Sequence, residues 1–129
     1  MSLQNRVLSV EAFQDHSSLM SGTCYQGRIN IRYSDLVRLF GKPLPGDAYK
    51  TEAEWVLRFH DYDADRYIVV TIYDWKVGPS YCGEEYGTAP EFNEVWHVGG
   101  HNIDALHVLQ DWLDMNGVPR VPNNRSMVA

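Results

Sequence analysis

The chain has 129 residues, 44% hydrophobic and 22% charged, and carries a net charge of −6. This length suits one domain, and the composition is that of a globular protein with a single core. The acidic balance argues against a nucleic acid polymer as partner, because phosphate contacts need clustered lysine and arginine. No apolar stretch approaches the roughly 18 residues of a membrane span, and the first residues lack a signal-peptide pattern. We therefore expect a cytoplasmic protein that does not contact a membrane.

The two cysteines, Cys24 and Cys82, lie far apart in the sequence. Because neither belongs to a Cys-x-x-Cys pair, a zinc ribbon and a thioredoxin-like redox motif are excluded. Free thiols are expected in a reducing compartment, with a disulfide between the two cysteines as the alternative.

The sequence divides into a core domain and two ends. Residues 1–26 are weakly patterned; within them, residues 10–20 favour a short helix and residues 21–27 a loop. Residues 27–117 carry the regular patterns of a core domain. Residues 118–129 contain two prolines and no periodicity, which predicts an extended or disordered tail.

A strand and a short helix open the core domain. Residues 27–33 alternate apolar and polar side chains, the pattern of a half-buried strand. Residues 34–41 predict a helix with Ser34 as its N-cap and Gly41 at its end. Prolines and a glycine make the following residues, 42–50, a loop.

Two further strands predict an antiparallel hairpin. Residues 53–59 alternate, and residues 67–76 are rich in β-branched and aromatic side chains. The polar stretch between them spaces Asp61, Asp63 and Asp65 as a calcium loop does. It lacks the glycine and the final glutamate of such a loop, so a plain hairpin turn is favoured.

The remaining chain completes a two-layer architecture. Residues 77–92 have no helix or strand periodicity, which is typical of a lid or binding loop. The alternative is a flexible loop without a binding role. Residues 93–98 predict a strand, and residues 102–116 an amphipathic helix that Gly117 ends. The order β-α-β-β-β-α predicts a single α+β domain, an antiparallel sheet of about four strands with helices on one face. The other face should be open to solvent or to a ligand.

The open face can be predicted in part from alternation. In residues 67–76 one set of side chains is aliphatic, whereas the other is mixed: Val69, Thr71, Tyr73 and Trp75. At least one of Trp96 and His97 should join this second set, together with either Trp55 or Arg58. The plain alternative is that these aromatic residues form the core. Aromatic surfaces interleaved with cations, however, are what a planar ligand with a phosphate would use.

The stretch EVWHVGGHN, residues 94–102, admits several interpretations. His97 and His101 are four positions apart, but the intervening Gly99 and Gly100 and the strand pattern argue against a metal-binding helix. A strand that runs through glycines into a helix N-terminus offers backbone N–H donors to an anion. The alternative is a tight strand-to-helix turn with Asn102 as its cap. General acid–base chemistry by either histidine also stays open.

The candidate ligand-binding residues are aromatic, cationic, histidine or glycine: Lys50, Trp55, Tyr73, Trp75, Lys76, Tyr81, Trp96, His97, Gly99, Gly100 and His101. No catalytic residue, metal ligand or cofactor is predicted.

The motifs YSDLVRLFGKP, GDAYKTEAEWVLRF, VVTIYDWK and EVWHVGGH together resemble a family of small, mostly uncharacterised bacteriophage proteins. The resemblance covers residues 29–113 and implies a phage accessory protein that acts in the cytoplasm of the bacterial host. Small phage proteins with aromatic and cationic pockets resemble sponges, which sequester cyclic-nucleotide or ADP-ribose-type immune signals.

Together these observations predict a non-catalytic binder of a small nucleotide-like anion, such as a host immune signal. One alternative is a protein-binding inhibitor of a host factor, which would use the acidic surface and residues 77–92. Another is a histidine-dependent phosphodiesterase or related hydrolase. The expected partners are thus a small ligand or a host protein, and a homo-oligomer stays open.

Overall fold

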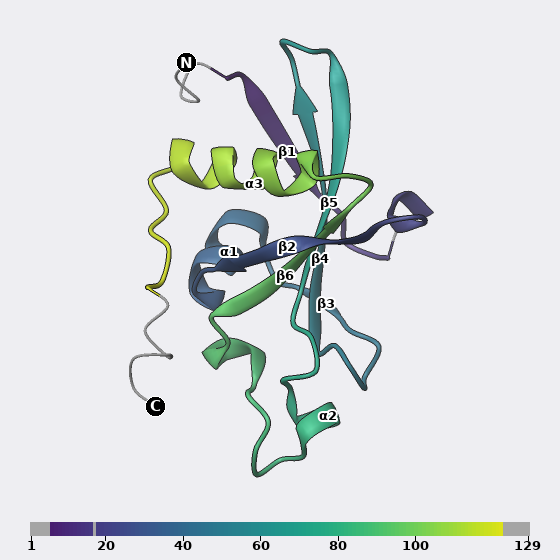
Figure 1. The fold of residues 1–129 in the computed structure, drawn as a ribbon, viewed down its shortest axis with the longest axis vertical. Helices are drawn as coiled ribbons and strands as arrows, with labels where there is room; N and C mark the ends of the chain where they lie inside the picture. The colour runs from purple at the N-terminus through teal and green to yellow at the C-terminus, as the bar shows by residue number, and fades with distance from the viewer. Residues whose placement is uncertain (1–5, 17, 123–129) are drawn as a thin grey trace.

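The computed structural model describes residues 6–16 and 18–122. In chain order the elements are β1 (Leu8–Ala12), η2 (Ser18–Met20), β2 (Cys24–Asn30), α1 (Tyr33–Phe40), β3 (Leu44–Pro45), β4 (Ala53–Asp61), β5 (Arg66–Tyr73), α2 (Pro79–Cys82), η3 (Pro90–Phe92), β6 (Val95–Gly100) and α3 (Asp104–Met115), where η marks a 3-10 helix (Figure 1). No helix within these residues is long and apolar enough to cross a bilayer.

Six strands form one antiparallel sheet in the order β1-β4-β5-β6-β2, and the short β3 pairs with β4. This confirms an α+β fold with an open antiparallel sheet. The expected number of about four strands is too low, because β1 and β3 were not anticipated. Strand β3 has only two residues, and β1 has five, too few for alternation to stand out against a helix-favouring composition.

The predicted hairpin is confirmed. Strands β4 and β5 pair along their lengths, with Trp55 opposite Ile72 and Glu54 opposite Tyr73. At the turn, Oδ1 of Asp61 accepts hydrogen bonds from the backbone N–H groups of Asp63, at 3.1 Å, and Ala64, at 3.2 Å. The side chain of Asp61 therefore stabilises the turn between β4 and β5.

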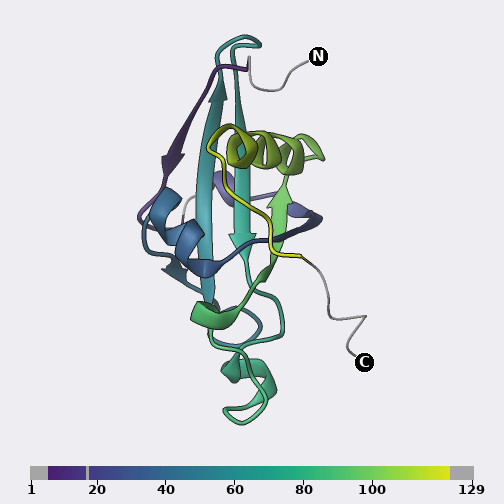
Figure 2. The ribbon, with the colours of Figure 1, turned by 90° about the vertical axis from the view of Figure 1, so that its left-hand side faces the viewer.

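Helices α1 and α3 lie on the same face of the sheet, which Figure 2 shows from the side that the helices cover. Leu36 and Phe40 of α1 and Leu109 and Leu113 of α3 are buried in one apolar cluster with the strands. Helix α1 begins at Tyr33, so the expected cap Ser34 lies inside the first turn, whereas Gly41 ends the helix as expected. One face of the sheet is thus covered by helices, and the opposite face is left for other segments.

The N-terminal segment differs from the expectation of a short helix. Residues 8–12 form β1, which pairs with β4, and the N–H of Phe13 donates to the carbonyl of Val56 at 2.9 Å. The chain then reaches η2 beside β5 and enters β2 at Cys24, inside the stretch expected to be a loop. Residues 13–16 and 18–23, which we call the N-terminal crossover, therefore lie along the face of the sheet opposite the helices.

The long segment between β5 and β6 closes on itself. The N–H of Thr88 donates to the carbonyl of Val77 at 2.6 Å, and the segment contains α2 and η3. Both views show it extending beyond the end of the sheet (Figures 1 and 2).

The first part of the expected tail packs against the domain. After α3, Val118 is buried and the N–H of Val121 donates to the carbonyl of Asn30 at 2.9 Å. Residues 123–129 of the expected tail lie outside the described residues.

Candidate functional site

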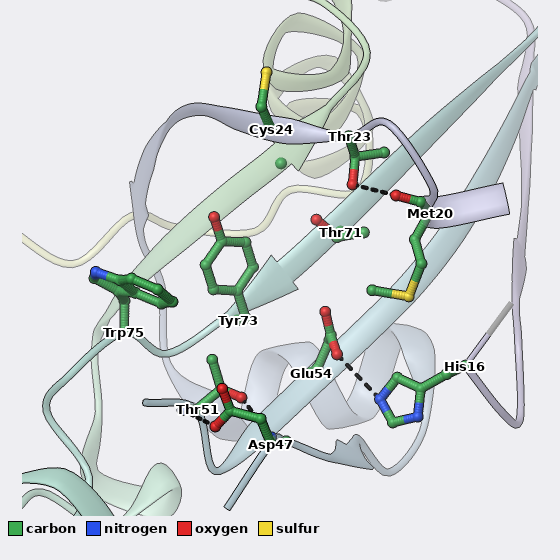
Figure 3. A pocket seen from close by; sticks show the side chains of 12 residues that line it. His16, Met20, Thr23, Cys24, Asp47, Thr51, Glu54, Thr71, Tyr73 and Trp75 are labelled. Atoms are coloured by element: carbon green, nitrogen blue, oxygen red, sulfur yellow. Dashed lines mark hydrogen bonds and ion pairs between the residues drawn. The ribbon is translucent and has the colours of Figure 1, made fainter. Parts of the chain in front are cut away.

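A pocket of about 490 Å³ opens on the sheet face opposite the helices (Figure 3). Its floor consists of residues from three adjacent strands: Glu54 from β4, Thr71 and Tyr73 from β5, and Gly99 from β6. Alternation along each strand points these side chains away from the helices. A Cβ atom on Gly99 would overlap the hydroxyl oxygen of Thr71, so the missing side chain helps to keep the floor hollow.

One wall of the pocket comes from the N-terminal crossover and the start of β2. It presents His16, Met20, Thr23 and Cys24. Nε2 of His16 lies 3.1 Å from Oε1 of Glu54, and the hydroxyl of Thr23 donates to the carbonyl of Met20 at 2.6 Å. The crossover is therefore tied both to itself and to the pocket floor.

The opposite wall is the loop that precedes β4. Oδ1 of Asp47 accepts the backbone N–H groups of Tyr49, at 2.9 Å, Lys50, at 2.8 Å, and Thr51, at 3.0 Å. Hydrogen bonds from the N–H groups of Thr51 and Tyr49 hold the pKa of Asp47 below its ordinary value. Asp47 is therefore an ionised residue whose Oδ1 shapes the loop, with Gly46 and Thr51 beside it on the wall.

The rim of the pocket is aromatic and cationic. Trp75 is partly exposed, and the Nζ atoms of Lys50 and Lys76 lie 5.7 and 5.5 Å from its ring centroid. The same Nζ of Lys76 lies 5.6 Å from the ring of Tyr81, which packs against Tyr49. Among the residues that the structure describes, no carboxylate forms an ion pair with either lysine. Both ammonium groups are thus available beside an exposed indole.

Burial controls the charges on the floor. It raises the pKa of Glu54, an effect that His16 partly offsets, and it also raises the pKa of Tyr73, which the Glu54 carboxylate raises further. The Tyr73 hydroxyl therefore keeps its proton at neutral pH and can donate a hydrogen bond. The buried Asp74 lies just beyond the floor, and its Oδ1 accepts the N–H groups of Glu52 and Ala53.

His97 supports the aromatic side of the pocket. Its imidazole lies 4.9 Å from the ring of Tyr25, 5.7 Å from that of Tyr73 and 6.3 Å from that of Trp75. Burial and the nearby Arg28 lower the pKa of His97, which favours the neutral imidazole. His97 is thus on the open face, as one of the two predicted options, and its ring packs behind the rim.

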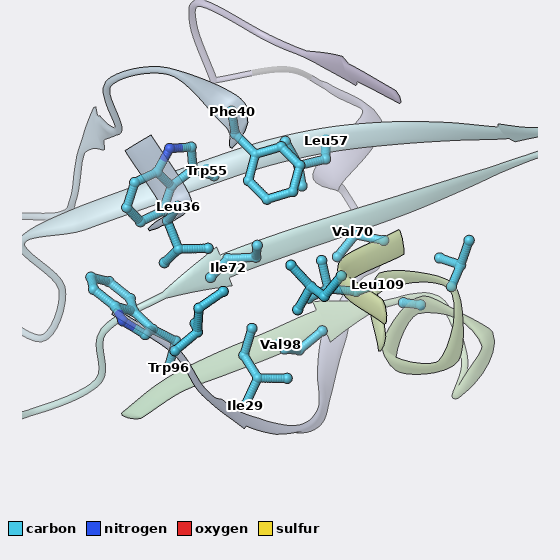
Figure 4. Close-up of a cluster of buried hydrophobic side chains, with 14 of the residues drawn as sticks. Ile29, Leu36, Phe40, Trp55, Leu57, Val70, Ile72, Trp96, Val98 and Leu109 are labelled. Carbon is cyan, nitrogen blue, oxygen red and sulfur yellow. The ribbon is translucent and has the colours of Figure 1, made fainter. Parts of the chain in front are cut away.

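Trp55 and Trp96 do not belong to this site, so their prediction as ligand contacts is wrong. They are 2% and 0% exposed, on the face covered by α1, where Figure 4 shows both among the buried side chains. Their ring centroids are 5.3 Å apart, and their Nε1 atoms donate to the carbonyls of Gly41, at 2.8 Å, and Asn93, at 3.2 Å. The alternation of each strand places Arg58 and His97 on the open face instead.

The predicted anion floor at the glycine turn is also absent. Gly100 is buried, and a Cβ atom there would overlap that of Ala105, so this glycine faces α3 rather than the pocket. The N–H of Asp104 donates to Oδ1 of Asn102 at 2.9 Å, and the next three N–H groups of α3 donate to backbone carbonyls. The N-terminus of α3 is therefore satisfied internally: Asn102, which precedes the N-cap Ile103, accepts the first of these N–H groups through its side chain.

His101 lies apart from the pocket. It is exposed beyond the end of β6 and borders a smaller hollow of about 100 Å³ with Arg66 and Asp104. Four positions along an extended strand separate His97 from His101 by roughly 13 Å. Within residues 6–16 and 18–122, no group of three or more His, Cys, Asp or Glu side chains is placed to hold a metal ion.

Several lining residues were missed by sequence reasoning. The pairing of His16 with Glu54 joins positions 38 apart, and no local pattern signals such a contact. Glu54 could have been predicted, because alternation in β4 places its side chain on the face of the sheet opposite to that of Trp55. Thr71 was assigned correctly to the mixed face by the same rule. Much of the pocket lining falls within the motifs GDAYKTEAE, TIYDWK and WHVGGH.

The fold and the site define a small α+β protein with an aromatic-rimmed pocket on the face of its sheet opposite the helices. No protein-family model matches the chain, and neither do curated proteins or solved structures. The function is therefore inferred from the pocket itself.

Proposed function

We propose that the protein is a non-catalytic binder of a small nucleotide-like anion in this pocket. The observation that carries the proposal is the placement of Trp75 at the rim, with the Nζ atoms of Lys50 and Lys76 both within 6 Å of its ring centroid. An indole offers a stacking surface to a base, and ammonium groups beside it neutralise a phosphate. The pocket volume lies within the range of about 300 to 1,000 Å³ that is usual for small-molecule sites.

The charges favour one orientation of such a ligand. Glu54 and Asp47 line the interior and would repel a phosphate, whereas Lys50 and Lys76 lie at the rim. The base would therefore enter the pocket beside Tyr73, and the phosphate would stay outside near the lysines. This arrangement reconciles an acidic protein with an anionic ligand, because the two parts of the ligand meet opposite local charges.

Binding without turnover is favoured by the placement of His97 and His101, the two histidines considered for acid–base chemistry. A phosphodiesterase needs an acid–base group close to the phosphate, but His97 and His101 are roughly 13 Å apart along an extended strand. His97 also packs behind Tyr73 and Trp75. Tight binding without cleavage is what sequestration of a host signalling nucleotide requires, and the resemblance to phage proteins makes such a signal the proposed ligand.

Titration calorimetry against cyclic and linear nucleotides and ADP-ribose tests the proposal. We expect at least one ligand to bind at micromolar concentration, and Trp75→Ala to weaken it by about tenfold or more, as loss of a base–aromatic stack does. The double variant Lys50→Ala/Lys76→Ala should weaken binding and reduce its dependence on salt. The remaining lysine of the chain, Lys42, gives the matched control Lys42→Ala, which should leave the affinity unchanged.

Two results would contradict this function. One is the absence of binding tighter than millimolar across the panel. The other is recovery of a cleaved product by chromatography after incubation with the wild-type protein, which would favour a hydrolase.

A second candidate, a protein-binding inhibitor, rests on the segment between β5 and β6. Tyr86 and Phe92 are 80% and 78% exposed there, next to the acidic Glu84, Glu85 and Glu91. Large exposed aromatic side chains on a protruding segment are typical of protein contacts. Retention of a host protein by the wild type, and its loss from Tyr86→Ser/Phe92→Ser, would support this candidate. Equal retention by both proteins would exclude the segment as the binding surface.

A further inference from the structure

Glu54 lies on the β4 side of the pocket floor, and one of its two carboxylate oxygens is unused by the residues that the structure describes. Its side chain is 14% exposed, and Oε1 is paired with His16 at 3.1 Å. Within the described part of the chain, no group donates to Oε2. Figure 3 shows the carboxylate directed into the space bounded by Tyr73, Thr71 and Met20. Oε2 therefore faces the open space of the pocket, where an N–H group of a ligand can take the place of water.

The surroundings of Glu54 define the ligand group that would satisfy it. None of the described residues that line the pocket is lysine or arginine, so the protein supplies no strong cation to the floor. Tyr73 is the direct cross-strand partner of Glu54, which places the two side chains next to each other. The floor therefore presents an acceptor, the carboxylate, beside a donor, the Tyr73 hydroxyl.

A planar base that complements this pair needs two adjacent N–H donors followed by an acceptor. Guanine offers that order along its Watson–Crick edge, with the 2-amino group, the ring N1–H and the O6 carbonyl. Each carboxylate oxygen accepts through two lone pairs, so Oε1 of Glu54 can keep its contact with His16 and accept a second N–H beside the one that Oε2 accepts. Two such parallel N–H bonds give direction as well as energy. Adenine presents a ring acceptor at N1 where guanine has a donor, and hypoxanthine lacks the 2-amino group.

We propose that Glu54 and Tyr73 select guanine-type bases, with Glu54 accepting the 2-amino and N1–H donors and Tyr73 donating to O6. This inference rests on the proposed function and names the ligand class: a guanine nucleotide whose phosphate lies near Lys50 and Lys76. His16 is a positioning residue, since its bond to Oε1 orients the carboxylate and leaves Oε2 facing the pocket.

The test compares the 5′-monophosphates of guanosine, inosine and adenosine, which share ribose and phosphate and differ only in the base. We expect the guanosine nucleotide to bind wild-type protein about tenfold or more tighter than the other two, because a site built for hydrogen bonding rejects analogues that lack the partner. In Glu54→Gln the preference for guanosine over inosine should fall to within about twofold, since the amide has one acceptor oxygen and no charge.

Glu52→Gln is the matched control. It removes the same charge two positions away, at a residue outside the pocket lining, and should keep the wild-type preference. A second readout uses the thiols: bound nucleotide should slow alkylation of Cys24, which lines the pocket, relative to Cys82, which does not. This readout and the wild-type panel need no variant, so misfolding of Glu54→Gln would leave the test intact.

The outcomes separate the two proposals. Equal affinity for all three nucleotides, with Cys24 protected, would overturn base selection by Glu54 while nucleotide binding stands. An unchanged guanosine preference in folded Glu54→Gln would do the same. If none of the three binds but another nucleotide of the wider panel does, selection of guanine is overturned and nucleotide binding stands. If nothing in the wider panel binds and Cys24 is not protected, both proposals are contradicted.

Discussion

Nε2 of His16 lies 3.1 Å from Oε1 of Glu54, a contact that joins the N-terminal crossover to the sheet across the pocket. The carboxylate is mostly buried, whereas the imidazole is about half exposed. Burial raises the pKa of Glu54, and His16 offsets only part of that effect. The pocket therefore holds a carboxylate at some expense of stability, as binding sites often do.

We predict that Glu54→Gln stabilises the fold near neutral pH while it weakens ligand binding. A carboxyl with a raised folded-state pKa binds its proton more tightly when folded. Its charged form therefore lowers stability above that pKa, and the loss disappears as the pH falls through it. The unfolding free energy from urea titration should rise by about 1 kcal/mol at pH 7, and the gain should shrink towards pH 4. A less stable variant at pH 7 would contradict this prediction.

The adjacent glycines of β6 should respond differently to alanine. In Gly100→Ala the new Cβ meets Ala105 on α3, a packed contact with little room to shift, so stability should fall by about 1 to 3 kcal/mol. In Gly99→Ala the Cβ meets the hydroxyl of Thr71, which can rotate, so the loss should be smaller while the pocket floor is filled. Thermal unfolding and calorimetry check both variants. Equal loss of binding in the two, at equal stability, would contradict the assignment of opposite faces.

The faces of the sheet show how far sequence reasoning reached. The β4–β5 hairpin, the covered face and the open face followed from alternation, and Tyr73, Trp75 and Gly99 were selected and do line the pocket. Alternation could not show whether Trp96 or His97 lies on the open face, because these neighbours point to opposite faces of β6 and both have a large ring. Which of the two side chains is buried depends on which face of the strand packs against α1, and that is a tertiary contact.

Other parts of the site depend on long-range contacts that local patterns do not encode. The N-terminal crossover approaches the open face because β1 pairs with β4 and so brings the residues that follow it across the sheet. Sequence reasoning took this region for a helix and loop, and therefore missed His16 and Cys24. The predicted anion floor is wrong for a local reason, since the first N–H groups of α3 already donate to Oδ1 of Asn102 and to backbone carbonyls.

Lys76 has a left-handed backbone conformation, with φ of 59°, and its N–H donates to the carbonyl of Lys50 at 2.8 Å. That conformation costs a residue with a Cβ about 1 kcal/mol or more, and glycine avoids this cost. We therefore predict that Lys76→Gly is more stable than Lys76→Ala by about 1 kcal/mol, although both remove the same charge from the rim. Chemical unfolding of the pair measures the difference. Lys42 lacks a positive φ, so at that position the glycine variant should be the less stable one.

Arg6 joins the far end of the sheet to α3. Its guanidinium forms a salt bridge with Asp61 at 3.0 Å and another with Asp111 of α3, and both carboxylates are mostly buried. Arg6→Ala would leave these carboxylates without a cation, so the unfolding free energy should fall by about 3 kcal/mol.

The control for Arg6 is Arg38→Ala, which removes the exposed pair with Asp35 and should cost less than about 0.5 kcal/mol. In Arg6→Ala/Asp111→Ala one of the stranded charges is gone, so the double variant should be more stable than the sum of the single losses predicts. Strict additivity in this cycle would show that Arg6 stabilises the fold through its packing rather than through the charge of Asp111.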